Sequence, residues 1–371
     1  MEATLTKTTI STAILQDLVS RAAKGSTNVD IIPLSCLMQL KVKDGVLTVR
    51  TTNNVNFVTV SSNVTAGDID IVVQTKLFTQ IIGKLQKEVT SLTVDGNKII
   101  IEADGKYNIP LALDTDGSNI QFPEIEFNPV GASRTITSAQ VRSILGINKA
   151  CKADMKEIPA IYNYYFDNEK VVTTNIFKGC FNTISVFETP VVLSPELVEL
   201  IPTVLNGDEV ITVSQDENSV EFLSSIGSVY GKKCAPADLE SYPADQLVEA
   251  LNVPMVNSAV INRSMLANAV DRICLFTDQL ESNKLEITFS SNSIHLYSAK
   301  TDSSEDVTYL KNPENLAEPI TVPVDGKMLA QVLAALDKEE VTIKFDAEVG
   351  VQFNLENLIV MLSVLQDNIQ E

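Results

Sequence analysis

The chain has 371 residues, with 28 lysines and arginines against 48 aspartates and glutamates, which gives a formal net charge of −20 at pH 7. An apolar content of 44% supports well-packed cores and excludes an intrinsically disordered chain. No run approaches the roughly 18 consecutive apolar residues of a membrane span, and the first residues lack the basic flank and apolar stretch of a secretion signal. We therefore expect a soluble, cytosolic protein of two or three domains.

The first predicted element is a short strand that leads into a helix at residues 12–24. Residues 10–15 follow a template of Ile, a small polar residue, three variable positions and an aliphatic residue. The template returns at residues 136–141 and 261–266, displaced by 126 and 125 positions. Solenoid repeats span some 20 to 50 residues, so a period this long indicates three copies of one domain-sized module. The small polar residue is expected to cap each helix.

Alternating apolar runs follow the first helix and predict antiparallel strands. Asp44-Gly45 and Asp95-Gly96 lie between such runs and are strong hairpin signals. Later in the chain the same role falls to Asp167-Asn168 and Ser291-Asn292.

A second helix is predicted in each module, after an apolar strand. The predicted caps Thr75, Ser194 and Asp325 each stand three positions before a large apolar residue. The dipeptide Glu-Val then begins the next predicted strand in each of the three modules, at Glu88-Val89, Glu209-Val210 and Glu340-Val341. Each module is therefore an α+β unit with two helices packed on antiparallel sheet. Clusters of proline and polar residues divide the chain into modules at 1–130, 131–254 and 255–371.

Basic residues concentrate in the predicted helices, at 12–24, 76–87, 138–152, 195–205, 263–274 and 326–338. These helices hold 12 Lys or Arg against 5 Asp or Glu, a net of +7, so the remainder holds 16 against 43, a net of −27. An acidic protein repels nucleic acid overall, but a basic helical face can attract phosphate. The alternative is that these are ordinary solvated helix residues, and the helix at 195–205 is itself acidic.

Residues for catalysis are scarce. The one histidine, His295, lies in an alternating stretch and cannot by itself build a metalloprotease motif or a Ser-His-Asp triad. The segment 227–233 fails the spacing of a phosphate-binding loop, and 114–117 lacks the later ligands of a calcium loop. Five cysteines without a close pair predict reduced thiols rather than disulfides or a metal site. We expect a scaffold or binding protein with no enzymatic activity, cofactor or metal.

The threefold module, the length and the basic helices together resemble the bacterial DNA sliding clamp, the beta subunit of DNA polymerase III, over essentially the whole chain. Further landmarks are the segment 71–78, the pair Tyr242-Pro243 and the apolar last strand at 358–365. This resemblance implies a head-to-tail dimeric ring of six modules, with twelve helices around a central hole and sheets outside. The resemblance further implies that double-stranded DNA would pass through this hole without sequence-specific contacts. Helix positions that would line it are Lys24, Lys76, Lys84, Lys87, Arg142, Lys149, Lys152, Arg263, Arg272 and Lys327.

The resemblance also implies two contact surfaces. Ring closure in the family pairs an edge strand of the first module with the third module of the partner, which places Tyr107 and Ile109 opposite Leu275 and Phe276. The alternative is that all four are core residues of their own modules. A groove for short peptides of the polymerase and the clamp loader matches Ile161, Pro243, Val248, Val360, Met361 and Leu365.

The groove region departs from the family. Where members carry Thr-Asp-Gly-His-Arg-Leu, this chain has Ile176-Phe177-Lys178-Gly179-Cys180-Phe181, and six residues follow Leu365. The departure favours a divergent member, encoded by a virus or plasmid and matched to its own polymerase. The predicted function is a processivity factor that tethers a replicative polymerase to duplex DNA after loading by a partner ATPase. One alternative is a clamp-fold interaction protein that never encircles DNA, and the other is an enzyme whose carboxylates and metal assemble only in the fold.

Overall fold

The computed structural model describes residues 7–27, 33–65, 67–154, 161–207, 210–314 and 316–365. The chain divides into two compact units, one made of residues 1–138 and 196–233 and the other of residues 139–195 and 234–371. Within the described ranges, none of the helices has the length and apolar character that a membrane span requires. The final residues 366–371 and the dipeptide position Glu209 lie outside the described residues.

Unit 1 contains a four-stranded sheet of order β1-β6-β7-β8 and an eight-stranded sheet of order β5-β2-β3-β4-β16-β15-β14-β9. Its strands are β1 (Lys7–Ser11), β2 (Leu37–Lys43), β3 (Val46–Thr52), β4 (Asn56–Asn63), β5 (Ile69–Gln74), β6 (Val89–Asp95), β7 (Lys98–Glu102), β8 (Lys106–Pro110), β9 (Arg134–Thr137), β14 (Val210–Gln215), β15 (Ser219–Leu223) and β16 (Gly227–Lys232). Its helices are α1 (Thr12–Ala22), α2 (Thr75–Ile82), α5 (Pro195–Val198) and α6 (Ile201–Val204), with short 3₁₀ turns η1 (Ala23–Gly25) and η2 (Pro33–Cys36).

Unit 2 contains an eight-stranded sheet of order β13-β10-β11-β12-β24-β23-β22-β17 and a four-stranded sheet of order β20-β19-β18-β21. Its strands are β10 (Tyr164–Phe166), β11 (Val171–Thr174), β12 (Lys178–Asn182), β13 (Val191–Leu193), β17 (Asn257–Asn262), β18 (Lys284–Phe289), β19 (Ser293–Ser298), β20 (Ser303–Thr308), β21 (Ile320–Asp325), β22 (Glu340–Asp346), β23 (Gly350–Leu355) and β24 (Leu358–Ser363). Its helices are α3 (Ser138–Ser143), the π-helical turn η3 (Ile144–Asn148), α4 (Lys149–Cys151), α7 (Pro236–Ser241), α8 (Ala244–Leu251), α9 (Arg263–Cys274), the 3₁₀ turn η5 (Gln279–Glu281) and α10 (Gly326–Ala335).

The strand order repeats three times along the chain. Strands β1 to β8 form the orders β1-β6-β7-β8 and β5-β2-β3-β4, and β9 to β16 and then β17 to β24 form the same two orders with each label advanced by eight. The predicted α+β fold of three repeated modules is therefore confirmed. The module boundaries after residues 130 and 254 stay a prediction, because each eight-stranded sheet joins halves of two successive repeats.

Successive repeats are joined at the edges of their sheets. Strand β4 pairs antiparallel with β16, and β12 pairs antiparallel with β24. In both joints the fourth strand of one repeat meets the eighth strand of the next. The strands that hold these two positions at the ends of the series are β8 and β20, and each is the outermost strand of its four-stranded sheet in the described part of the chain.

The predicted hairpins follow from turn chemistry. Asp44 and Gly45 both have positive φ angles, 51° and 74°, as a two-residue hairpin turn that matches the twist of its strands requires. Lys43 and Val46 pair across that turn, so β2 and β3 form the expected hairpin. Of the segment 227–233, residues Gly227–Lys232 form strand β16, and 114–117 forms a turn in which Gly117 N donates to the Asp114 carbonyl.

The predicted helix caps are confirmed in the third repeat. Asn262 caps α9 by accepting from Met265 N at 2.9 Å, and Asp325 caps α10 by accepting from Met328 N at 3.0 Å. The prediction is wrong for Ser11, which makes no side-chain capping bond, and for Thr75, which lies inside α2 with its Oγ1 buried. At the start of α1 the backbone N–H of Thr12 instead donates to the Glu88 carbonyl at 2.9 Å, and Thr12 Oγ1 bonds Thr90 Oγ1 at 2.8 Å.

Several helices also differ in length from the prediction. Helix α2 ends at Ile82, where Gly83 follows, so Lys84 and Lys87 lie beyond it. The predicted helix 195–205 breaks into α5 and α6, since Pro202 fits only the first turn of a helix. Helices α7 and α8 were not predicted. Their segment carries neither a long apolar period nor a strong cap.

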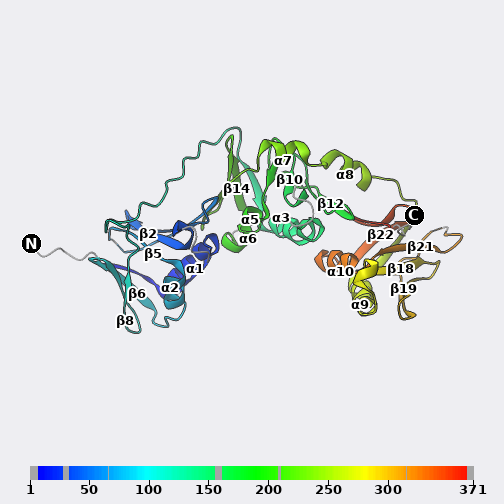
Figure 1. Cartoon of the computed structure of the whole chain (residues 1–371), viewed down its shortest axis with the longest axis horizontal. Coiled ribbons are helices and arrows are strands. Elements are labelled where there is room, and N and C mark those ends of the chain that lie inside the picture. The colour runs from blue at the N-terminus through cyan, green and yellow to red at the C-terminus, as the bar shows by residue number, and fades with distance from the viewer. Residues whose placement is uncertain are drawn as a thin grey trace, which may run out of the picture. The chain divides into compact units, whose positions relative to one another are not determined.

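The core of the third repeat lies between its helices and sheets. Phe289 of β18 and Phe345 of β22 stack with ring centroids 3.9 Å apart, and this pair joins the two sheets. Leu266 and Val270 of α9 and Leu329 of α10 belong to the same buried cluster. Figure 1 shows α9 and α10 side by side next to β18 and β19. The apolar spacing of both helices therefore turns one face inward and leaves their polar residues on the surface.

Candidate nucleic-acid interface

Most of the predicted DNA-contacting residues are exposed at helix surfaces or ends. In unit 1, Lys24 lies in η1, Lys76 is in the first turn of α2, and Lys84 and Lys87 follow that helix, all exposed. In unit 2, exposed residues of this set are Arg142, Lys149, Arg272 and Lys327, and Lys152 is half-buried.

Two arginines of the set are bound within the chain. Arg263 donates from Nε to the Lys338 carbonyl at 3.1 Å and from Nη1 to the Leu333 carbonyl at 3.2 Å, so its guanidinium covers the carboxyl end of α10. The hydroxyl of Ser264, and then Arg263 itself, lower the pKa of Glu339. Phosphate could reach Arg263 only by displacing these partners, and the structural role is the better explanation of this residue.

Arg272 donates from Nε to Glu305 Oε2 at 2.9 Å, across from α9 to β20. The hydrogen bond from Arg272 lowers the pKa of the Glu305 carboxyl below its usual range and raises that of the arginine. The arginine side chain stays 58% exposed, so it can still face a phosphate, although its charge is already balanced by Glu305.

A cavity of about 780 Å³ in unit 2 brings three predicted lysines together. Lys149 lines it from α4, Lys152 lines it directly after α4, and Lys327 lines it from the first turn of α10. The ammonium of Lys152 also lies over the Tyr162 ring, 4.4 Å from its centroid. Grouped cations of this kind are the electrostatic feature that a phosphate-bearing ligand requires.

Sequence reasoning missed a fourth lysine of this cavity. Lys178 opens β12, is 4% exposed, and donates from Nζ to Gln331 Oε1 of α10 at 2.5 Å. Lysines are almost never this deeply buried. The sequence offers only a weak signal, since Lys178 stands at an apolar position of an alternating strand.

The predicted peptide-groove residues lie in different environments. Ile161 is 2% exposed and packs with Tyr242 and Ala244. Val360 is fully buried in the core of the third repeat, so it offers no surface to a ligand in this state. Met361 packs with Leu251 at the end of α8.

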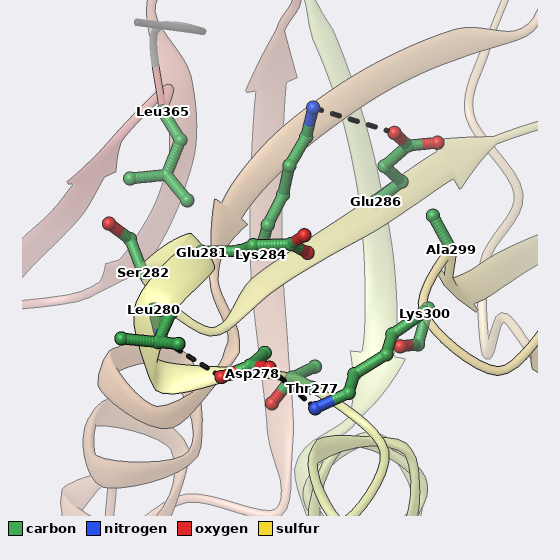
Figure 2. Close-up of a pocket in the computed structure, with 11 residues that line it drawn as sticks. Thr277, Asp278, Leu280, Glu281, Ser282, Lys284, Glu286, Ala299, Lys300 and Leu365 are labelled. Atoms are coloured by element: carbon green, nitrogen blue, oxygen red, sulfur yellow. Dashed lines mark hydrogen bonds and ion pairs between the residues drawn. The ribbon is translucent and has the colours of Figure 1, made fainter.

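The other three groove residues are half-buried. Pro243 precedes α8, Val248 lies on it, and Leu365 follows β24. Leu365 lines another cavity, of about 350 Å³, beside the turn η5. Figure 2 shows that, in this cavity, Lys284 points to Glu286 and Lys300 points to Asp278. The nitrogen–oxygen distances of these ion pairs are 3.7 Å and 2.5 Å. Both lysines are therefore bound to carboxylates, and we assign this cavity no ligand.

The turn between β11 and β12 is strained at Ile176. This residue has a φ of 79°, a conformation that favours glycine and strains a β-branched residue. The predicted departure from the family hexapeptide over 176–181 stays a prediction. A Cβ on Gly179 would lie 2.6 Å from Cδ1 of Leu247, so a leucine of α8 fills that space.

The predicted contact residues for a second copy lie at the two ends of the repeat series. Tyr107 is half-buried on the edge strand β8, and Ile109 on the same strand is 1% exposed and packs inside its own sheet. The alternative of a core role is therefore the better explanation of Ile109. Leu275 is 80% and Phe276 43% exposed directly after α9, which is unusual for large apolar side chains.

His295 and the cysteines add no reactive cluster. Nδ1 of His295 lies 2.9 Å from Oδ1 of Asp306 on the exposed face of the sheet. The five cysteines are free thiols, of which Cys151 and Cys180 are buried. Over the ranges given above, no group of three His, Cys, Asp or Glu side chains is placed to hold a metal ion.

The strand order and edge joints described above are those of the bacterial sliding-clamp fold. The beta subunit of DNA polymerase III from Thermotoga maritima superimposes with a TM-score of 0.81 at 17% identity, covering 97% of this chain and 99% of that one. The polymerase beta subunit from Streptococcus pyogenes gives 0.85 at 14% identity, covering 97% and 100%. The DNA polymerase sliding clamp from Bacillus subtilis gives 0.84 at 15% identity, covering 98% and 100%. No protein-family model and no curated protein sequence matches the chain.

Proposed function

We propose that this chain is a DNA polymerase processivity factor: two copies close head to tail into a ring that encircles duplex DNA. The replicative polymerase and a clamp-loader ATPase are its proposed partners, and the chain itself is not an enzyme. The sliding-clamp fold supports this function. The observation that carries the proposal is that β8 and β20 are the outermost strands of the two four-stranded sheets among the described residues.

The two edges are complementary because β20 is the fourth strand of its repeat and β8 is the eighth strand of its repeat, and strands in these two positions pair with each other at both joints within the chain. Strand β4 meets β16, and β12 meets β24, so the same rule brings β20 of one copy to β8 of another. Exposed edge strands have unpaired backbone groups and readily accept another strand. Lys106 lies on β8 and Asp306 lies on β20, so the two edges carry side chains of opposite charge.

Helix packing leads to the same pairing. At the first joint α1 contacts α6, where Arg21 Nη1 donates to the Val204 carbonyl at 2.7 Å, and at the second joint α4 contacts α10. The corresponding helices at the ends of the series are α9 and α2. The exposed Leu275 and Phe276 after α9 would then meet a hollow of about 630 Å³ beside α2 and β8, lined in part by Leu77 and Leu111.

A ring would act by topology. The lysines exposed on and near the helices would meet phosphates without reading bases, and the acidic remainder of the surface would repel DNA that is not threaded. Tethering raises the effective concentration of the polymerase at a primer end, so a weak peptide contact suffices.

The test is retention on DNA of different topology after loading. A closed ring should persist on nicked circular DNA and escape from the free ends of the same DNA made linear. Equal escape from both would contradict encirclement. Solution mass is the second measurement, since a stable monomer would favour an interaction protein of this fold that binds partners without enclosing DNA.

A further inference from the structure

Helices α1 and α9 hold the same place in the first and third repeats, and their buried faces fix which residues correspond. Buried apolar residues are Leu15, Leu18, Val19 and Ala22 in α1, and Leu266, Ala269, Val270 and Ile273 in α9. Taken in order, each pair is separated by 251 positions, as 266 minus 15 shows. By the same displacement, Arg21 of α1 corresponds to Arg272 of α9.

Arg21 shows what this position does where two repeats are joined. Its Nη1 donates to the Val204 carbonyl at 2.7 Å and to the Asn206 carbonyl at 2.8 Å, at the carboxyl end of α6. Its Nε donates to Oδ2 of Asp17 at 2.7 Å, so a carboxylate of its own repeat orients the guanidinium. Only 15% of the side chain stays exposed. Arg21 therefore links the first repeat to the second through the last carbonyls of a helix.

Arg272 has only half of this arrangement. Its Nε also donates to a carboxylate of its own repeat, Oε2 of Glu305 at 2.9 Å. Its Nη1, the nitrogen that Arg21 uses for the joint, donates to none of the described residues, and 58% of the side chain is exposed. Strand β20 of this repeat is outermost in its sheet among the described strands, so the joint of Arg21 has no counterpart there within one chain.

Buried leucines identify the carbonyl position at the end of the second helix in every repeat. They lie seven residues after a buried apolar helix residue, in the pairs Phe78 and Leu85, Val198 and Leu205, and Leu329 and Leu336. The residue directly before each leucine is Lys84, Val204 or Ala335. At the second joint, a Cβ on Gly146 of η3 would lie 3.3 Å from the Ala335 carbonyl oxygen. Both joints therefore bring the first helical segment of one repeat to this carbonyl of the next.

The carboxyl end of α2 has acceptors at the corresponding place. Gln16 of α1 donates to the Ile82 and Leu85 carbonyls, at 3.0 and 2.9 Å. The Lys84 and Gln86 carbonyls accept no backbone or side-chain hydrogen bond from the described residues, and both residues are exposed. These two carbonyls have the spacing of the pair bound at the first joint, and the carboxyl end of a helix favours a cation.

We propose that Arg272 binds a second copy of this chain, with Nη1 donating to the Lys84 and Gln86 carbonyls at the end of that copy's α2. The proposal rests on the proposed function, since this contact lies where two copies would close. The ion pair with Glu305 orients the guanidinium for it. Arg272 is then a residue of the contact between copies, in place of the DNA contact predicted for it.

The test is the dissociation constant of the dimer, measured on the full chain by sedimentation equilibrium. Arg272→Met removes the donor, and Arg272→Lys keeps the charge but lacks the planar fork that can bind a carboxylate and two carbonyls together. Arg142→Met is the matched control, since Arg142 is an exposed helix arginine in the second repeat. Lys84→Gln is the second control, because it keeps the backbone carbonyl and removes a charge of the same sign as that of Arg272.

Both Arg272 variants should raise the dissociation constant at least about 100-fold, because each of two interfaces loses about tenfold with a hydrogen bond from a charged group. Neither control should weaken the dimer. Thermal unfolding of the monomeric protein should change little, since an ion pair this exposed contributes little to stability. A change below about tenfold in either Arg272 variant, or an equal change in a control, would overturn the proposal.

Photo-cross-linking tests the position of the contact directly. A benzophenone amino acid at position 84 should cross-link to the end of α9 that carries Arg272. In a mixture of isotope-labelled and unlabelled chains, mass spectrometry should show that the two peptides come from different copies. Cross-links confined to one copy, or to other segments of the second copy, would overturn the proposal.

These results separate the contact from the proposed function. A dimer that depends on Arg272, in a protein that escapes equally from circular and linear DNA, would contradict encirclement and leave the contact standing. Retention on circular DNA with both Arg272 variants unchanged would support the ring and overturn the contact. A chain that stays monomeric at every concentration would overturn both.

Discussion

Leu275 offers the sharpest test of assembly between copies. The side chain is 80% exposed after α9, so the isolated chain gains little from it. Leu275→Ala removes three carbon groups from the side chain, and burial of each stabilises a contact by about 0.8 kcal/mol. Because an interface would bury the 80% of Leu275 that is now exposed, the substitution should weaken each interface by about 2 kcal/mol. A closed pair has two such interfaces, so the dimer should be weakened by about 4 kcal/mol, or about a thousandfold in dissociation constant.

Sedimentation equilibrium over a range of protein concentrations measures this constant directly. Leu223→Ala is the control, since Leu223 ends β15 and is 46% exposed away from the two terminal edges. Thermal unfolding of both variants at a concentration where the protein is monomeric should match the unmodified chain. A shift in dissociation constant below about tenfold, or an equal shift in the control, would refute the assignment of Leu275 to the contact between copies.

Three further outcomes follow from single contacts. Asn262→Ala should lower the free energy of unfolding by about 1 kcal/mol, because its capping bond to Met265 N is removed; Ser11→Ala, without such a bond, should change it little, and equal effects in chemical denaturation would contradict this. Gly227→Ala should destabilise the β4–β16 joint by more than about 2 kcal/mol, because the new Cβ would overlap the Thr59 carbonyl oxygen. Gly96→Ala, at a position with open space around it, should lower the free energy of unfolding by only about 1 kcal/mol in the same assay. Arg272 lowers the pKa of Glu305 in the folded chain, so the charged carboxylate should stabilise the fold fully above pH 4.5 and lose this contribution as the pH falls through the lowered pKa. In Arg272→Ala, NMR titration should show the pKa of Glu305 rising toward 4.5. An unchanged pKa would contradict the assigned ion pair.

The repeat could be predicted from sequence because it rests on local chemistry that recurs at a fixed spacing. Asp44-Gly45 predicts a hairpin turn because these two residue types tolerate the positive φ angles that the turn requires. The apolar spacing of 263–274 predicts a helix, and α9 has these bounds. These signals are complete within a few residues. The order of strands within a module depends on pairs such as Lys7 with Thr93, and the joint between β12 and β24 depends on pairs such as Lys178 with Leu362, so neither leaves a local pattern.

The candidate site was harder for the same physical reason. Charge alone could not separate Arg263, which covers the end of α10, from Lys327, which is exposed at a cavity. Burial of Lys178 comes from packing between β12 and α10, and a lysine in a strand predicts the opposite. The strained turn at Ile176 could not be predicted either, because sequence does not show a positive φ at a β-branched residue.

Pairing the fourth strand of one repeat with the eighth strand of the next has a consequence for how many copies can assemble. Because β8 and β20 are different surfaces, the proposed contact between copies would be heterologous, and the pairing chemistry would set no limit on the number of subunits. Curvature alone decides between a closed dimer, a larger circle and an open filament. A substitution that bends an internal joint, such as one at Gly227, could therefore turn a finite assembly into a growing polymer while every edge contact stays intact.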